Sequence, residues 1–246
     1  MILNILSSSS SGNCYILHSD TEALIIEAGI RLSAIKKALD YNISKVGGVI
    51  ATHSHGDHSG YIKECADAGM EVYCISDVIK RRELENHSRA HMIKPMQGFC
   101  VGRFSVFPFP VEHDIPCIGF HINHPETGNI LFITDTFTCE YSFQDLNHIL
   151  IEANYSEEML QKNIERGEVK KSMRKRLMYS HMELQTTKQY LKAVDLSKVI
   201  NIVLIHLSNQ NSDEDRFIQE IRELTGKATY AADKNMQLQI NNNQPF

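Results

Sequence analysis

Short apolar runs of the length of single strands recur along the chain, and segments with apolar residues at helical spacing separate many of them. The runs predict strands at residues 2–6, 14–18, 23–27, 46–51, 71–75, 118–122, 130–134, 149–152, 199–205, 228–230 and 236–240, and a hairpin at 99–106. Helices are predicted at residues 33–39, 61–68, 76–86 and 183–194, and from Ser212 or Asp213 to residue 224. Because no linker, repeat or break in composition divides the chain, residues 1–246 are predicted to form one α/β domain.

Polar segments near both ends interrupt this pattern. Residues 7–13, which begin with five consecutive serines, lie between the first two strands, so a tight loop is favoured over the flexible linker that serine runs usually form. The last two predicted strands are expected to close a second sheet. The polar residues 241–246 are expected to fray.

Four side chains able to bind metal follow the apolar run at 46–51 within six residues: His53, His55, Asp57 and His58. Because side chains two residues apart point to the same side of an extended chain, His53 and His55 can hold one cation together. Gly56 lets the backbone turn, so that Asp57 and His58 suit a second cation beside the first. Mixed imidazole and carboxylate ligands suit zinc, manganese or iron better than calcium. The alternative, a polar loop whose histidines cap the next helix, is disfavoured by this dense spacing.

Composition narrows the classes of function. The net charge of −5 means that any contact with nucleic acid must come from a local basic patch. The six cysteines form no close pair, which indicates free thiols in a reducing compartment, and no apolar segment approaches membrane-spanning length. Residues 1–6 lack the basic start of a signal peptide, so we expect a cytoplasmic protein that does not act on membranes, and a homodimer is compatible with the sequence.

The His-x-His-x-Asp-His spacing of residues 53–58 resembles the signature of the metallo-β-lactamase superfamily. Residues 9–13 and the His-Leu-Ser-Asn-Gln-Asn sequence of residues 206–211 are similar to motifs of its YycJ/WalJ-type exonuclease branch, which is related to tRNase Z. The resemblance implies an αββα four-layer sandwich, in which helices flank two mixed β-sheets. It also implies a hydrolase that uses two divalent metal ions.

The same resemblance implies roles for residues scattered along the chain. His113 would complete the first cation site with His53 and His55, and His206 would complete the second with Asp57 and His58. Asp135 would lie between the two cations, although on its own it would be a turn or cap residue. The residues implied to contact substrate are Ser9, Asn13, Ser208, Asn209 and Asn211. Glu27 stands where the family usually has aspartate, so the support of the metal loop is expected to differ here.

Glu152 and His181 are the candidates that distinguish phosphodiester chemistry. Glu152 ends an apolar run, where an unpaired carboxylate is costly, and the resemblance implies that it orients His181. A hydroxide bridging two cations about 3.5–4 Å apart would be the nucleophile, oriented by Asp57. Cleavage of a phosphodiester then gains from an acid that protonates the leaving alkoxide, a role that suits His181 beside an acidic partner.

Our hypothesis is therefore a two-metal phosphodiesterase, a nuclease or exonuclease acting on DNA or RNA. One alternative is a cyclic-nucleotide phosphodiesterase of the same fold, and a second is a thioester, lactone or lactam hydrolase, for which His181 would be dispensable. A third is a metal-binding protein without turnover. The basic run at residues 166–176 is typical of a solvated helix face. The functional alternative is that it forms a positively charged patch that attracts the phosphates of a substrate.

Overall fold

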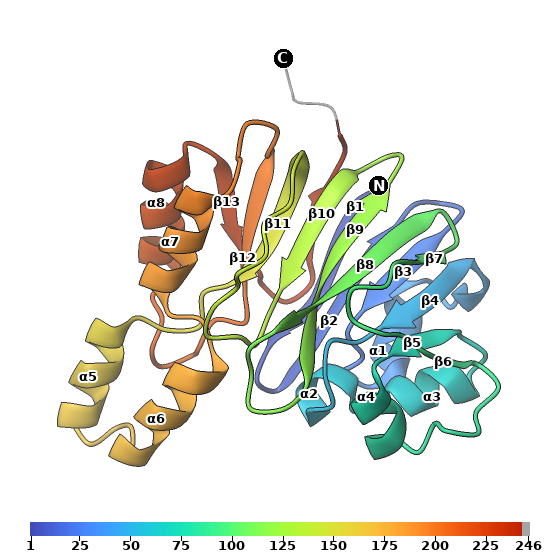
Figure 1. Cartoon of the computed structure of the whole chain (residues 1–246), viewed down its shortest axis with the longest axis horizontal. Helices are drawn as coiled ribbons and strands as arrows, with labels where there is room; N and C mark the ends of the chain where they lie inside the picture. The colour runs from blue at the N-terminus through green and yellow to red at the C-terminus, as the bar shows by residue number, and fades with distance from the viewer. Residues whose placement is uncertain (243–246) are drawn as a thin grey trace.

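A computed structural model describes residues 1–242, in which two seven-stranded sheets face each other (Figure 1). The first sheet has the order β14-β1-β2-β3-β4-β5-β6, and the second has the order β13-β12-β11-β10-β9-β8-β7. Both are mixed, because antiparallel pairs such as β1 with β2 adjoin parallel pairs such as β3 with β4. The first sheet contains β1 (Ile2–Ser9), β2 (Gly12–His18), β3 (Ala23–Ile26), β4 (Val46–Ile50), β5 (Val72–Cys74), β6 (Ala90–Met92) and β14 (Met236–Gln239).

The second sheet begins where the chain leaves the first. It contains β7 (Phe99–Val101), β8 (Phe104–Val111), β9 (Cys117–His124), β10 (Gly128–Ile133), β11 (Leu146–Glu152), β12 (Asn201–Ile205) and β13 (Ala228–Ala231). Pro108 and Pro110 lie within β8, as their preference for extended backbone predicts. Of the parallel strands β10 to β13, the two central ones, β11 and β12, are almost entirely buried because helices cover the outer face of the sheet.

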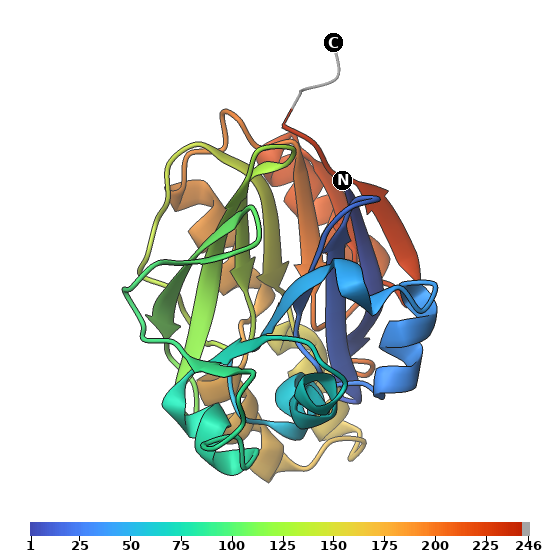
Figure 2. The same cartoon turned by 90° about the vertical axis from the view of Figure 1, so that its right-hand side faces the viewer.

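Helices lie outside both sheets, which gives the four layers (Figures 1 and 2). They are α1 (Leu32–Ala38), α2 (Gly56–Ser59), α3 (Ile62–Asp67), α4 (Ser76–Arg81), α5 (Glu157–Glu165), α6 (Lys171–Ser180), α7 (Leu184–Ala193) and α8 (Glu214–Thr225). α7 and α8 cover the second sheet, whereas α5 and α6 extend away from the sandwich at one end of it. Among the described residues, no helix combines the length and the apolar character needed to span a membrane.

Three apolar clusters hold the layers together. The largest fills the space between the two sheets, where Tyr15 of β2 meets Phe132 of β10 with ring centroids 5.2 Å apart. A second lies between the second sheet and α7 and α8, and it includes the fully buried Phe217 and Ile221 of α8. Each fully buried side chain of this size contributes about 1.5–3 kcal/mol, so the amphipathic face of α8 fixes it to the sheet. A small third cluster around Leu160 and Val169 secures the pair α5 and α6.

Several predicted boundaries were wrong. Ser7–Ser9 belong to β1, because each pairs with a residue of β2 and only Ser10 and Ser11 form the turn. β14 pairs with β1 in the first sheet, so it does not close the second. α4 includes Ser76, follows Ile75 without a side-chain cap, and ends at Arg81. The expected fraying of residues 241–246 falls largely on residues 243–246, which lie outside the described residues.

Candidate metal centre

The candidate ligands gather at one end of the sandwich because each follows the end of a strand. His53 and His55 follow β4, His113 follows β8, Asp135 follows β10, and His206 follows β12. A packed sheet fixes such positions, while the loop beyond the strand leaves room for substrate. The short helix α2 then presents Asp57 and His58, which the sequence predicted only as a turn.

Backbone conformation marks three residues of this region. Glu27, Asp135 and His206 have φ values of 66°, 48° and 55°, in the left-handed region that residues other than glycine rarely adopt. Each lies within two residues of the end of a buried strand. Such backbone costs about 1–3 kcal/mol per residue and persists where the surrounding structure imposes it, which is common at functional sites.

Three histidine rings converge on one point. His53 Nε2 lies 3.1 Å and His113 Nε2 lies 3.3 Å from His55 Nδ1. His113 donates its Nδ1–H to the carbonyl of Ser180 at 3.0 Å, so its Nε2 carries a lone pair. These separations match the roughly 3.3–3.4 Å expected between two imidazole nitrogens that each lie about 2.0–2.1 Å from one tetrahedral zinc ion. The three rings can therefore hold one cation.

Glu27 supports this cluster through a hydroxyl group. Thr52 Oγ1 donates to Glu27 Oε1 at 2.6 Å, so it can only accept a hydrogen bond from His53 Nδ1, which lies 2.9 Å away. That bond leaves His53 Nε2 unprotonated toward the cluster. Glu27 Oε1 also lies 3.4 Å from His58 Nδ1. Glu27 thus contacts Thr52, which supports the first cluster, and His58, which belongs to the second.

The second cluster contains Asp57, His58 and His206. Asp57 Oδ2 lies 3.4 Å from His58 Nε2 and 3.6 Å from His206 Nε2. His206 Nε2 is buried and has no hydrogen-bond partner among residues 1–242. Asp135 Oδ2 is 2.7 Å from His58 Nε2, and Asp135 also groups with His53 and His58, so it lies between the two clusters.

Charge within the site favours bound cations. Burial disfavours a charged imidazole, yet the neighbouring carboxylates, Asp135 foremost, raise the pKa of His206 to about 9. The pKa of His58 is also raised, because Asp135 and Glu27 outweigh the desolvation of its ring. Burial alone would raise the pKa of Asp135, but His206 and His58 hold it well below its usual range. The buried carboxylates thus draw positive charge onto the imidazoles, a role that two divalent cations would take over at a site rich in nitrogen and oxygen donors.

Glu152 and His181 form a buried pair beside these clusters. Glu152 Oε1 accepts a hydrogen bond from His181 Nδ1 at 2.7 Å, while Oε2 accepts the backbone N–H groups of Thr136 and Met182 at 3.2 and 3.1 Å. Burial lowers the pKa of His181, but the carboxylates of Glu152 and Asp135 raise it overall to about 10. Asp135, Glu152, His181 and His206 are also close enough to share a cation. However, both oxygens of Glu152 already accept hydrogen bonds, Oε1 from His181 Nδ1 and Oε2 from the backbone. Glu152 therefore serves to hold the imidazole in place.

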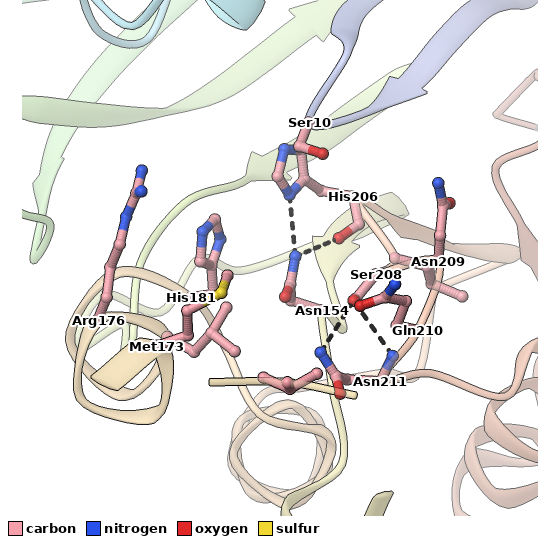
Figure 3. A pocket seen from close by; sticks show the side chains of 13 residues that line it. Ser10, Asn154, Met173, Arg176, His181, His206, Ser208, Asn209, Gln210 and Asn211 are labelled. Carbon is pink, nitrogen blue, oxygen red and sulfur yellow. Dashed lines mark hydrogen bonds between the residues drawn. The ribbon is translucent and has the colours of Figure 1, made fainter. Parts of the chain in front are cut away.

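The residues expected to contact substrate occupy different places. Asn13 Nδ2 lies 3.1 Å from His58 Nε2, at the candidate ligands. Ser9 is hydrogen-bonded to Ser11 and lines a second hollow, which it shares with Ser208 and Asn209. Ser208, Asn209 and Asn211 line a cavity of about 360 Å³ that reaches His181 and His206 (Figure 3).

Sequence analysis missed several residues that hold the site. Asn154 donates to the carbonyl of His206 at 2.7 Å, and Arg82 donates to the carbonyl of Ser54 at 2.6 Å within the metal loop. Arg82 directly follows α4, and nothing near it in the sequence points to the metal loop. Thr52, next to the histidine motif, and Asn154, two residues after Glu152, were the supports with a positional clue.

Comparisons with known proteins agree with this architecture. Residues 9–112 match the model of the metallo-beta-lactamase superfamily. The chain is 25% identical over 230 residues to an "Exodeoxyribonuclease YycJ" of Bacillus anthracis, which covers 85% of this chain and 83% of that protein. Among solved structures, the metallo-beta-lactamase fold protein YhfI from Bacillus subtilis has a TM-score of 0.72 at 16% identity, covering 97% of this chain and 99% of that one. Human tRNase Z, short form, has a TM-score of 0.64 at 15% identity, covering 98% and 99%.

Proposed function

From the premise that this chain has a metallo-β-lactamase domain and is a metallo-hydrolase of that superfamily, we propose that it is a two-metal phosphodiesterase that cleaves DNA or RNA. The observation that carries the proposal is the hydrogen bond of 2.7 Å between Glu152 and His181, next to two clusters of candidate ligands. A carboxylate–imidazole pair there supplies a proton donor, which a phosphodiester with a poor leaving group needs. The similar exodeoxyribonuclease and tRNase Z proteins support the same substrate class.

In this proposal each cluster holds one cation. His53, His55 and His113 would hold the first, Asp57, His58 and His206 would hold the second, and Asp135, which lies between the clusters, would serve both. When bound, two zinc, manganese or iron ions would lower the pKa of an attacking water and balance the charge of the phosphate. The free thiols of the chain support a reducing compartment such as the cytoplasm. A homodimer remains a prediction.

The residues of the chain provide the proton transfers. Glu152 accepts the Nδ1–H of His181, which fixes the ring and turns Nε2 toward the substrate side. As the bond between phosphorus and the leaving oxygen breaks, Nε2–H donates its proton to that oxygen. Asp57, which is partly exposed at the mouth of the site, accepts a hydrogen bond from the attacking water and orients it.

A cyclic-nucleotide phosphodiesterase is the second candidate. The cavity beside His181 and His206, at about 360 Å³, lies at the small end of the range for ligand sites and could hold a single nucleotide. A polynucleotide should show steep salt dependence, because binding releases counterions, whereas a cyclic nucleotide should show little. Activity measured at two salt concentrations separates the two.

The first test is hydrolysis of bis(p-nitrophenyl) phosphate by the manganese- or zinc-loaded protein. We expect turnover by the wild type, none by Asp135→Ala, and a loss with His181→Ala that reaches about 10²–10⁴-fold on diesters with poorer leaving groups. His91→Ala is the matched control, because His91 is exposed and pairs with Glu71 far from the site. A loaded wild type that is inert toward diesters but cleaves a thioester or lactone would overturn the proposal.

A further inference from the structure

The cavity of about 360 Å³ next to the candidate site has two unlike walls (Figure 3). One wall comes from α6 and presents Met173 and Leu177, which lie on one face of that helix because they are four residues apart. The other wall is the segment after β12 and presents Asn209 and Gln210. His181 and His206 line the same cavity. An apolar surface thus faces a polar one, directly beside the proposed chemistry.

The polar groups of this cavity are available to a ligand. The side chains of Asn209 and Gln210 are exposed and have no hydrogen bond among the described residues. Asn211 differs, because it is buried and pairs with Asn163 at 3.0 Å and with Ser208, which holds the segment in place. The cavity therefore combines a fixed frame with free amide donors and acceptors, the groups that contact the edge of a nucleobase.

Arg176 adds a positive charge at the rim. It lines the cavity beside His181, and within residues 1–242 it makes no ion pair. Arg174, two residues earlier, is instead bound to Glu157. Met173 is a large apolar side chain that stays 45% exposed. A flexible thioether of this kind makes favourable contacts with aromatic rings.

We propose that this cavity binds one unpaired nucleoside, the one attached to the phosphate that is cleaved. Its base would lie against Met173 and Leu177 and bond to Asn209 or Gln210, while Arg176 contacts the phosphate beside His181. The volume suits a single nucleoside, so a base must leave its duplex stack to enter, and single-stranded ends are the preferred substrate. This inference rests on the proposed function and deepens it by naming the part of the substrate that is recognised.

The experiment compares two diesters with the same leaving group, thymidine 5′-monophosphate p-nitrophenyl ester and bis(p-nitrophenyl) phosphate. We expect the manganese-loaded wild type to prefer the nucleotide ester in kcat/KM. Arg176→Ala should lower kcat/KM for that ester about 10-fold or more, from the loss of a charge-assisted hydrogen bond. Met173→Ala should lower the preference about 2- to 10-fold. Both side chains are exposed, so neither change should affect folding.

Matched controls come from the same helix. Lys175→Ala removes the same charge as Arg176→Ala, and Met178→Ala removes a side chain that is 46% exposed, but neither residue lines this cavity. Equal losses of kcat/KM with Arg176→Ala and Lys175→Ala would mean that α6 attracts the substrate through its overall positive charge. That result would overturn the subsite. An absence of preference for the nucleotide ester in the wild type would overturn it as well.

A binding measurement separates this inference from the proposed function. Calorimetric titration with thymidine 5′-monophosphate, and with inorganic phosphate for comparison, measures the affinity of the cavity for each ligand and does not require turnover. Tighter binding of the nucleotide than of phosphate, reduced by Met173→Ala but not by Met178→Ala, supports the subsite even if no diester is cleaved. Equal affinity for the two ligands overturns the subsite even if bis(p-nitrophenyl) phosphate is hydrolysed.

Discussion

Glu152→Gln is the substitution that most directly tests whether Glu152 keeps His181 protonated so that it can act as the general acid. Glutamine has the same size, and its amide oxygen can still accept the N–H groups of Thr136 and Met182. Its NH₂ group, however, would face His181 Nδ1 where a carboxylate oxygen now lies at 2.7 Å. Because that group donates, it opposes protonation of Nδ1, and the doubly protonated ring that acts as the acid is disfavoured.

The magnitude follows from the bond that is lost. A hydrogen bond to a charged group is worth about 1.5–3 kcal/mol, which corresponds to roughly 10- to 100-fold in rate. The loss should stay below the effect of removing the ring, about 10²–10⁴-fold, because Asp135 Oδ1 lies 3.0 Å from the same Nδ1 and still supports it. Glu152 is thus a positioning residue.

The assay is the dependence of kcat on the leaving group, measured with p-nitrophenyl and phenyl esters of thymidine 5′-monophosphate at constant metal content. We expect Glu152→Gln to slow the phenyl ester much more than the p-nitrophenyl ester, since only the phenyl ester needs a strong acid. Glu22→Gln is the control, because Glu22 pairs with the buried His124 at 3.1 Å outside the site. Equal slowing of both esters, or none, would refute the proposed acid.

Three further predictions concern stability and metal affinity. Burial lowers the pKa of His148 to about 4, so between pH 6.5 and 4 the unfolded chain binds a proton at this residue that the folded protein does not. This residue alone should therefore lower the free energy of unfolding by about 2 kcal/mol from pH 7 to 5, and the difference between wild type and His148→Gln, measured by urea denaturation in EDTA at the two pH values, should show that contribution; an equal pH dependence of the two proteins would contradict it. Thr52→Val breaks the link between Glu27 and His53 and should weaken zinc binding by about 10- to 100-fold in a chelator competition, whereas unchanged affinity would contradict the role of the hydroxyl. Phe217→Ala should cost about 3–5 kcal/mol of unfolding free energy, and a loss below 1 kcal/mol would mean that α8 does not depend on this contact.

Much of the fold could be predicted from local pattern. Continuous apolar runs located β10, β11 and β12, because strands covered on both faces need apolar residues at every position. The hairpin of β7 and β8 was confirmed at Gly102, whose φ of 57° suits a turn. The αββα sandwich itself followed from the family resemblance, and the comparisons confirm it.

Pairing between distant strands could not be predicted in the same way. β14 carries a short alternating pattern that fits the edge of either sheet. In the folded protein β13 already forms the edge of the second sheet, and β14 pairs with β1 at the edge of the first. The serine run gave a similar error, because serine is a poor strand former that pairing with β2 nevertheless accommodates.

The sequence by itself determined which chemistry is available, because His53, His55, Asp57 and His58 all carry metal-binding groups and lie within six residues directly after a buried strand. Only the tertiary structure decided what surrounds them. Ser180 at the end of α6 accepts the Nδ1–H of His113, and this contact between residues 67 positions apart leaves no local trace. The left-handed backbone at Asp135 and His206 and the wall that α6 places beside the site are likewise imposed by packing, since their energies come from partners far away in sequence.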